Sequence, residues 1–168
     1  MSECSLAYIG LGSNLNNPSQ QIYDGLHALK TLPLCEDLQC ANWYSSKAIG
    51  PGEQPNYINT VASLATTLSP IELLHQLQRI EDQQGRQRDI RWGARTLDLD
   101  LLLYDNIELQ HKELTLPHPQ MQERSFVLVP LHDIAPSLIL PNGKSLAGLI
   151  KHCDISELQL VETRLALF

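Results

Sequence analysis

The chain has 168 residues, of which 43% are hydrophobic and 5% aromatic, and its formal net charge is -7. This composition excludes a disordered chain and a coiled coil, and the negative charge argues against binding to nucleic acid or to anionic membranes, which select basic surfaces. No apolar run reaches the roughly 20 residues that span a bilayer and the N-terminus lacks a secretory signal, so we expect one soluble, cytoplasmic, monomeric domain over residues 1–168 that binds neither nucleic acid nor membranes.

The first predicted strand is the apolar segment from Leu6 to Leu11. It leads through a Gly-containing turn into a helix that we expect to begin at Pro18, capped by Asn17, and to run to about Lys30. The turn, Gly10 to Leu15, begins like a dinucleotide-binding fingerprint, but a leucine stands where the third glycine belongs, and the chain has too few strands and helices for a doubly wound parallel sheet. Its glycines are therefore expected to allow a tight turn or the close approach of a ligand.

Two further strands are predicted at residues 38–46 and 57–67. The later segment is rich in β-branched and small residues, which favour strands. Between the two segments, residues 50–55 contain two glycines and two prolines and are predicted to form a loop.

A second helix has the clearest start in the chain, because Ser69 is followed by a proline and by Glu72, which together predict a capping box. It is expected to end near Gly85, and an irregular connection over residues 86–94 leads into a fourth strand at 96–104. The order strand, helix, strand, strand, helix, strand is the split βαβ arrangement. The prediction is an α+β protein: a ferredoxin-like sandwich in which two main helices cover one face of an antiparallel sheet, with extra C-terminal elements.

The segment after Tyr104 is predicted to form smaller elements. These are a hairpin over 107–116, helical stretches at 123–132 and 146–153, and an edge strand or docked tail at 158–167. The cysteines show neither C-x-x-C pairs nor zinc-ligand spacing and are expected to be buried free thiols. They are Cys4, Cys35, Cys40 and Cys153.

Asp98 and Asp100 are the most informative residues for chemistry. Alternate residues of a strand point to one face and lie about 6.5–7 Å apart, so the two carboxylates converge on one side. Two such carboxylates repel each other unless neutralised, and oxygen ligands suit Mg²⁺, which also takes ligands from water and substrate phosphates. The alternative is an exposed strand face with two solvated acids. The leucines of the strand are expected to face the core on the other side; they are Leu97, Leu99, Leu101 and Leu103.

Five of the seven arginines lie in the segment that precedes these acids. They are Arg79, Arg86, Arg88, Arg91 and Arg95. The acids in the same segment, Glu81, Asp82 and Asp89, are too few to neutralise them, so we expect an anion site rather than a solvated basic loop. Phosphoryl transfer depends on positioning and charge stabilisation more than on a reactive side chain. A metal beside an arginine-rich loop is therefore expected to bind a polyphosphate and to support its transfer.

The segment from Arg91 to Leu102, RWGARTLDLDLL, resembles the signature of the 6-hydroxymethyl-7,8-dihydropterin pyrophosphokinases of folate biosynthesis. Other stretches match that family in the same order: Gly12–Asn14, Gln54–Asn59, Gln78–Glu81 with Gly85 and Arg86, and Leu116–His118 with Arg124 and Phe126. The resemblance covers nearly all of Leu6 to Leu149. It implies an ATP-dependent diphosphotransferase that moves pyrophosphate from ATP to the hydroxymethyl group of the reduced pterin, releases AMP and requires two Mg²⁺ ions.

The resemblance also implies roles for individual residues. The metal ligands would be Asp98 and Asp100, and these two with Arg86 and Arg95 would be the catalytic residues. The ATP site would contain Gln78, Glu81, Trp92, the backbone at Leu101, Thr115, His118 and Arg124. The pterin site would contain Asn14, Ser46, Ala48, Ile49, Gly50, Tyr57, Asn59 and Phe126. A pterin ring would stack between the aromatic rings of Tyr57 and Phe126, which is a favourable way to bury a flat heterocycle.

Three features depart from the family's pattern. Ser46, Lys47 and Ala48 stand where many members carry Thr-Pro-Pro, and Pro119 replaces an aromatic residue after the histidine. The loop from Arg88 to Trp92 is one residue shorter than in some relatives, so the resemblance assigns no role to Arg88 or Arg91. Two other hypotheses compete with the pyrophosphokinase. A binding module on the same scaffold would bind ligand without Mg²⁺-dependent AMP release. A metal-dependent phosphate hydrolase would share the two aspartates but would consume ATP without a pterin.

Overall fold

The computed structural model describes residues 3–47, 55–85 and 96–162. A 3₁₀ turn (Met121–Glu123) precedes the third helix. The helices and strands, in chain order, are β1 (Ser5–Ser13), α1 (Pro18–Lys30), β2 (Cys35–Cys40), β3 (Trp43–Ser46), β4 (Tyr57–Thr66), α2 (Pro70–Gln83), β5 (Asp98–Tyr104), β6 (Leu109–Gln110), β7 (Thr115–Leu116), α3 (Ser125–Ile134), α4 (Leu146–Lys151) and β8 (Gln159–Glu162).

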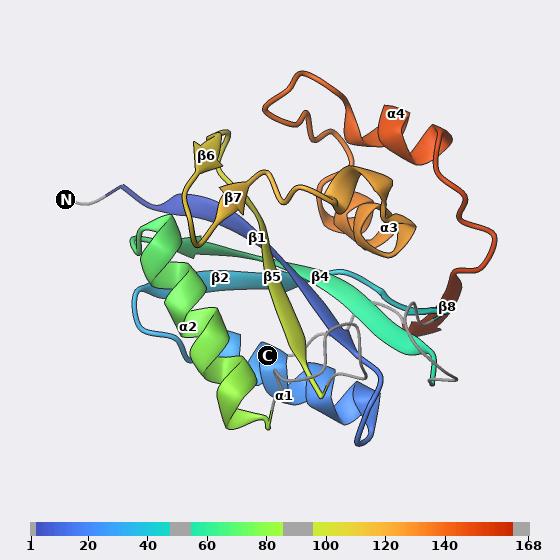
Figure 1. Ribbon diagram of the computed structural model, residues 1–168, viewed down its shortest axis with the longest axis horizontal. Coiled ribbons are helices and arrows are strands. Elements are labelled where there is room, and N and C mark those ends of the chain that lie inside the picture. The colour runs from blue at the N-terminus through green and yellow to red at the C-terminus, as the bar shows by residue number, and fades with distance from the viewer. Residues whose placement is uncertain (1–2, 48–54, 86–95, 163–168) are drawn as a thin grey trace.

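The main sheet has the strand order β5-β1-β4-β3-β8, and β2 pairs with β4 next to β3. All of these pairings are antiparallel. With β2 and β3 counted as one bent strand, the order is that of the split βαβ arrangement, which confirms the predicted α+β fold. Figure 1 shows α1 and α2 on one side of the sheet and α3 and α4 on the other.

Two apolar clusters hold the layers together. One joins the sheet to α1 and α2 and contains the fully buried side chains of Ile9, Leu26 and Leu77. The other joins the opposite face of the sheet to α3 and α4, and it contains Leu128 and Leu131. The prediction that helices cover one face is therefore correct for α1 and α2, and the C-terminal helices cover part of the second face.

A β-bulge corrects the prediction for Leu103. The pairing of β5 with β1 shifts between Tyr8, which is opposite Leu103, and Ile9, which is opposite Leu101. The extra residue, Leu102, breaks the alternation, so Leu102 and Leu103 both join the cluster beneath α3. Leu97, Leu99 and Leu101 face α1 and α2 as predicted.

The two predicted helix starts have different outcomes. The capping box of α2 is confirmed, since the N–H of Glu72 donates to Ser69 Oγ at 3.2 Å and the Ser69 N–H donates to Glu72 Oε1 at 3.1 Å. Helix α1 begins at Pro18 as expected, but the Asn17 side chain makes no capping hydrogen bond. Asn17 has a left-handed backbone with φ 63°, whereas a side-chain cap normally requires an extended residue.

The single strand predicted at 38–46 is wrong, because the segment forms two strands, β2 and β3, separated at Ala41 and Asn42. The predicted end of the first strand is also wrong: β1 continues to Ser13, through the glycines that were assigned to a turn. The Thr60 hydroxyl donates to the Asn42 carbonyl at 3.0 Å and lies 3.3 Å from the Ala41 carbonyl oxygen. The Thr60 side chain on β4 thus donates a hydrogen bond to the backbone between β2 and β3.

The predicted C-terminal elements are present with adjusted bounds. The hairpin is β6 and β7, the helical stretches are α3 and α4, and β8 is an edge strand beside β3. The end of the predicted tail, residues 163–168, lies outside the described residues. All four cysteines are free, as expected. The prediction that they are buried is correct for Cys40 only, because Cys4 is exposed and the other two are partly exposed.

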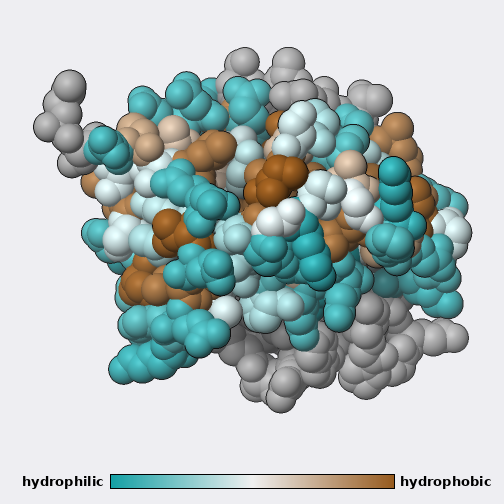
Figure 2. Space-filling view, turned by 90° about the horizontal axis from the view of Figure 1, so that it is seen from above, coloured by the Kyte–Doolittle hydropathy of each residue, from teal (hydrophilic) through white to brown (hydrophobic). Residues whose placement is uncertain are grey.

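The surface mixes polar and apolar residues. On the face seen in Figure 2, hydrophobic residues are interspersed with hydrophilic ones, as is usual for folded proteins. Among the residues that the structure describes, no helix is both long and apolar enough to cross a membrane.

Candidate active site

A cavity of about 150 Å³ lies on the face of the sheet that carries α3. Its floor includes two glycines of the central strand β1, Gly10 and Gly12. Gly12 is paired with Asp98 of β5 on one side and with Asn59 of β4 on the other, and Gly10 is paired with Asp100. The two aspartates and the asparagine therefore flank a strip of sheet that has no side chains.

The cavity has space above β1 because Gly10 and Gly12 carry no side chains. A Cβ atom at Gly12 would lie 2.9 Å from Oδ1 of Asn59, closer than side-chain contacts allow. Asn59 is 6% exposed, and its Nδ2 donates to Ser46 Oγ at 2.7 Å. This bond fixes the orientation of the amide, so that Oδ1 stands beside the glycine.

Aromatic and charged side chains line the rest of the cavity. Tyr57 comes from β4 and Phe126 from the first turn of α3. The Arg124 guanidinium lies 5.6 Å from the centroid of the Phe126 ring, and its Nη1 is 4.0 Å from Asp100 Oδ2. Its Nη2 donates to the side chain of Gln120. A cation thus lies between the ring of Phe126 and the carboxylate of Asp100.

A second cleft, of about 280 Å³, lies where β5, α2 and the β6–β7 hairpin meet. Its lining includes Leu101, Thr115 and His118. Asp100 lines both this cleft and the first cavity. Asp100 is therefore a residue that borders both hollows.

His118 is held in a defined protonation state beside this cleft. Burial lowers its pKa, the nearby Arg124 lowers it further, and Asp98 opposes the shift. The imidazole is therefore neutral at pH 7, because its ordinary pKa of about 6.5 is already below that pH. Its Nδ1 accepts the N–H of Gln120 at 3.2 Å, which places the ring proton on Nε2. The ring can thus donate a hydrogen bond from Nε2.

Glu81 occupies a structural position near the same strand. It is 3% exposed, and its Oε2 accepts the N–H of Leu99 at 2.8 Å. The carboxylate ties the last turns of α2 to the edge strand β5. The family resemblance implied an ATP-site role for Glu81, and the structure shows its carboxylate bound to the strand that carries Asp98 and Asp100.

The structure brings together most of the site residues that it describes. The first cavity is lined by Ser46, Tyr57, Asn59, Asp98, Asp100, Arg124 and Phe126, and the second cleft by Asp100, Leu101, Thr115 and His118. Three predicted residues line neither hollow: Gln78 is half-buried on α2, Glu81 is the buried acceptor of the Leu99 N–H, and Asn14 is buried and donates to the Pro55 carbonyl at 3.0 Å. Others lie outside the described residues: Ala48, Ile49, Gly50, Arg86, Arg88, Arg91, Trp92 and Arg95.

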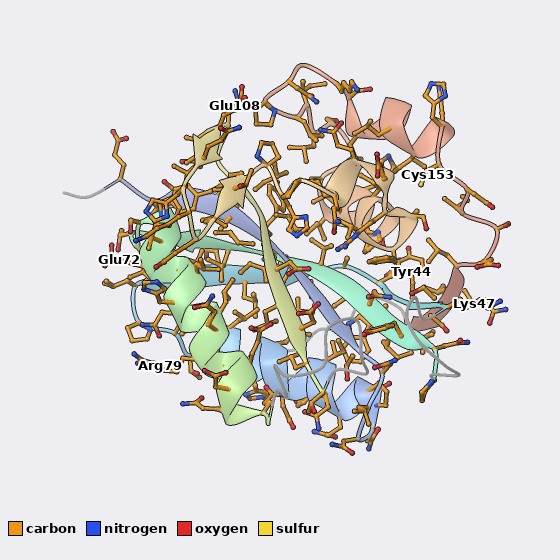
Figure 3. All side chains as sticks on the ribbon, in the orientation of Figure 1. Tyr44, Lys47, Glu72, Arg79, Glu108 and Cys153 are labelled. Carbon is orange, nitrogen blue, oxygen red and sulfur yellow. The ribbon has the colours of Figure 1, made fainter. Side chains whose placement is uncertain are left out.

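Sequence reasoning missed part of the lining. Thr60 and Val127 border the first cavity and were not predicted. Gly10 and Gly12 also line it, and their segment was expected to allow either a tight turn or the close approach of a ligand. Lys47, which belongs to the segment that departs from the family's Thr-Pro-Pro pattern, also borders the first cavity. Figure 3 shows the Lys47 side chain at the outer edge of the molecule, close to β8.

The donor set at the site suits a hard cation. Among the described residues, no group of three His, Cys, Asp or Glu side chains is placed to hold a metal. Asp98 and Asp100 nevertheless share one face above side-chain-free backbone. Mg²⁺ is commonly bound by one or two carboxylates, with water and substrate phosphates completing its coordination, so these residues fit it.

Comparison with known proteins places this arrangement in a family. Residues 8–136 match the model of the family described as 7,8-dihydro-6-hydroxymethylpterin-pyrophosphokinase (HPPK). A Haemophilus influenzae protein named 2-amino-4-hydroxy-6-hydroxymethyldihydropteridine pyrophosphokinase is 50% identical over 145 residues, which cover 86% of this chain and 91% of that protein. A Pseudomonas aeruginosa protein of the same name is 46% identical over 152 residues, covering 90% of this chain and 94% of that one.

The fold is also found among solved structures. A crystal structure of Plasmodium falciparum HPPK-DHPS superimposes with a TM-score of 0.67 at 14% identity, over 90% of this chain. This chain spans 42% of that larger protein. At this identity the likeness supports the fold and says nothing further of chemistry.

Proposed function

Because this chain belongs to the 7,8-dihydro-6-hydroxymethylpterin-pyrophosphokinase family and is an enzyme that transfers pyrophosphate in folate biosynthesis, we propose that its donor is ATP and its acceptor 6-hydroxymethyl-7,8-dihydropterin. The reaction joins the terminal pyrophosphoryl group of ATP to the hydroxymethyl oxygen of the pterin. AMP is the leaving group, and the hydroxyl proton is released.

The position of Asp100 between two hollows is the observation that carries this proposal. The first cavity has two aromatic residues and a fixed amide, and the second cleft has Thr115 and the Nε2–H of His118. A group that passes from a ligand in the cleft to a ligand in the cavity would pass beside Asp100, which borders both. Transfer between two bound substrates requires this adjacency, since reacting atoms must approach within about 3–3.5 Å.

The first cavity fits a flat, polar heterocycle. Tyr57 and Phe126 offer aromatic faces, and Oδ1 of Asn59 offers a hydrogen-bond acceptor whose orientation is fixed by Ser46. Such a combination of aromatic walls and a few placed polar groups is typical of small-molecule sites. We assign the pterin to this cavity and the nucleotide to the second cleft.

The phosphates would lie beside the two aspartates. Asp98 and Asp100 would hold two Mg²⁺ ions, which when bound supply positive charge against the phosphate oxygens. Arg124 would add a fixed cation from the other side, and His118 would donate from Nε2 to a phosphate oxygen without contributing charge. Arg86 and Arg95, which lie outside the described residues, are proposed as further partners of the transferring group.

The test is AMP formation by the purified protein from ATP, with and without Mg²⁺ and the pterin, while the pterin mass is followed. AMP that appears when both are present, with a mass gain of two phosphates on the pterin, is the expected result. ADP formation, or ATP hydrolysis without the pterin, would contradict the proposal and indicate a phosphate hydrolase. Ligand binding without turnover would indicate a binding module.

A further inference from the structure

A hydrogen bond links the sheet to α3 outside the residues assigned above. The Tyr44 hydroxyl on β3 donates to Asp133 Oδ2, near the end of α3, at 2.7 Å, and both residues are partly buried. Burial, followed by this bond and the charge of Asp133, raises the pKa of Tyr44 to about 12. The hydroxyl therefore stays protonated and donates throughout the pH range in which the protein works. Figure 3 shows Tyr44 just below α3.

Both partners of this bond connect to the first cavity. Tyr44 is paired with Asn59 in the sheet, and Ser46, two residues along the same strand, accepts the hydrogen bond of the Asn59 amide. On the helix, Phe126 and Asp133 are seven residues apart, which is close to two turns and places them on the same face. The cavity floor and the aromatic residue above it thus lie on the two elements that this bond joins.

The packing of α3 couples the position of Asp133, near its end, to that of Phe126, in its first turn. Between Phe126 and Asp133, the side chains of Val127, Leu128 and Leu131 are buried against the sheet with 6%, 0% and 0% exposure. Such close packing resists sliding or rotation of one turn without the next. Fixing Asp133 therefore limits the movement of Phe126, about 10 Å away along the axis.

We propose that Tyr44 and Asp133 are positioning residues for the acceptor substrate. Their hydrogen bond holds α3 at the height above the sheet at which Phe126 contacts the pterin ring. Contact distances between stacked atoms are about 3.5–4.0 Å, and a displacement of 0.5–1 Å already forfeits a quarter to a half of the attraction. This inference rests on the assignment of the cavity to the pterin.

A purely structural role for the bond predicts a different result, and the chain contains a matched control. Tyr104 is 8% exposed, belongs to the cluster under α1 and α2, and donates its hydroxyl to the Leu68 carbonyl. Tyr104→Phe removes a tyrosine hydrogen bond from the face of the sheet opposite the cavity. It should lower the melting temperature and leave the pterin Kd unchanged.

The experiment measures the pterin Kd by titration calorimetry with Mg²⁺ and a non-hydrolysable ATP analogue, for the wild type, Tyr44→Phe, Asp133→Asn and Tyr104→Phe. Tyr44→Phe should raise the pterin Kd about tenfold, as when the docked position of α3 falls to about a tenth of the population. Asp133→Asn should raise it less, because the amide oxygen still accepts. The Kd of the analogue alone should change less than that of the pterin, since β5 and the β6–β7 hairpin build most of the second cleft.

Each outcome decides the proposal. A Tyr44→Phe protein that melts earlier, as Tyr104→Phe does, but binds the pterin like the wild type would overturn it. If Tyr44→Phe does not fold, Asp133→Ala, which removes the acceptor altogether, takes its place: an unchanged pterin Kd in that variant overturns the proposal, and a raised one supports it. A wild-type protein that binds the nucleotide analogue but not the pterin would refute the pterin assignment and the inference together.

Discussion

The two glycines of the cavity floor provide a sharp test, because they differ in the space above them. A Cβ atom at Gly12 would lie 2.9 Å from Asn59 Oδ1, whereas one at Gly10 would lie 3.6 Å from the nearest atoms of Leu102, an ordinary contact. Gly12→Ala therefore forces Asn59 to move and strains its bond to Ser46. Gly10→Ala on the same strand and face requires no such movement.

The expected cost of Gly12→Ala follows from these contacts. Overpacking costs about 1–3 kcal/mol, and a lost hydrogen bond adds about 1 kcal/mol. Alanine also lowers the conformational entropy of the unfolded chain, which stabilises the folded state by about 0.4–1 kcal/mol. The net loss in the free energy of unfolding should be about 1–4 kcal/mol, which lowers the melting temperature by roughly 2–4 °C per kcal/mol at this chain length.

Urea unfolding and pterin titration of both variants measure the difference. Gly10→Ala should remain within about 1 kcal/mol of the wild type, with the gain from the unfolded state partly offsetting any strain. Gly12→Ala should also weaken pterin binding, because Asn59 leaves its place. Equal stability and equal pterin Kd in the two variants would refute the reasoning that Gly12 makes room for Asn59.

Three further predictions address the metal, the histidine and a helix cap. Asp100→Asn should lower Mg²⁺-dependent AMP formation by a factor on the order of 10²–10³, as for the loss of one preorganised electrostatic group, with the far-UV circular dichroism unchanged. Because the folded protein lowers the pKa of His118, the unfolded chain binds its proton first, so stability should fall as the pH drops below about 6.5. Urea unfolding at pH 7.5 and 5.5 should show a smaller loss in His118→Gln than in the wild type. Ser69→Ala removes the acceptor of the Glu72 N–H and should cost about 1 kcal/mol in urea unfolding, without a change in AMP formation.

The fold could be predicted where local periodicity carried the information. The capping box at Ser69 and the alternation through Leu101 are properties of short segments, and both are present in the structure. The exceptions depend on partners far along the chain. Leu103 changes face because of a bulge opposite Tyr8, and the break after Cys40 depends on the hydroxyl of Thr60. No local pattern encodes either contact.

The site could be predicted in its charged residues but less well in its shape. Asp98 and Asp100 were visible as alternating acids within an apolar strand, whereas Gly12 became part of the floor only through its pairing with Asp98 and Asn59. Glu81 shows a further limit. The resemblance implied an ATP-site role for this residue, and no local pattern indicated that one of its carboxylate oxygens accepts the N–H of Leu99 on the edge strand. Which strand lies at an edge is a property of the whole sheet.

The edge position of β5 allows one strand to border both hollows. Its face presents Asp98 and Asp100 above the glycines of β1, and its other side, which pairs with no strand among the described residues, borders the cleft formed with α2 and the β6–β7 hairpin. A strand in the middle of the sheet would have a neighbour in place of that cleft. With a net charge of -7 the protein does not attract a polyphosphate by its overall field, so binding must depend on cations close to the acids. Arg124, 4.0 Å from Asp100, is such a cation, and it lies at the start of α3 beside the ring of Phe126.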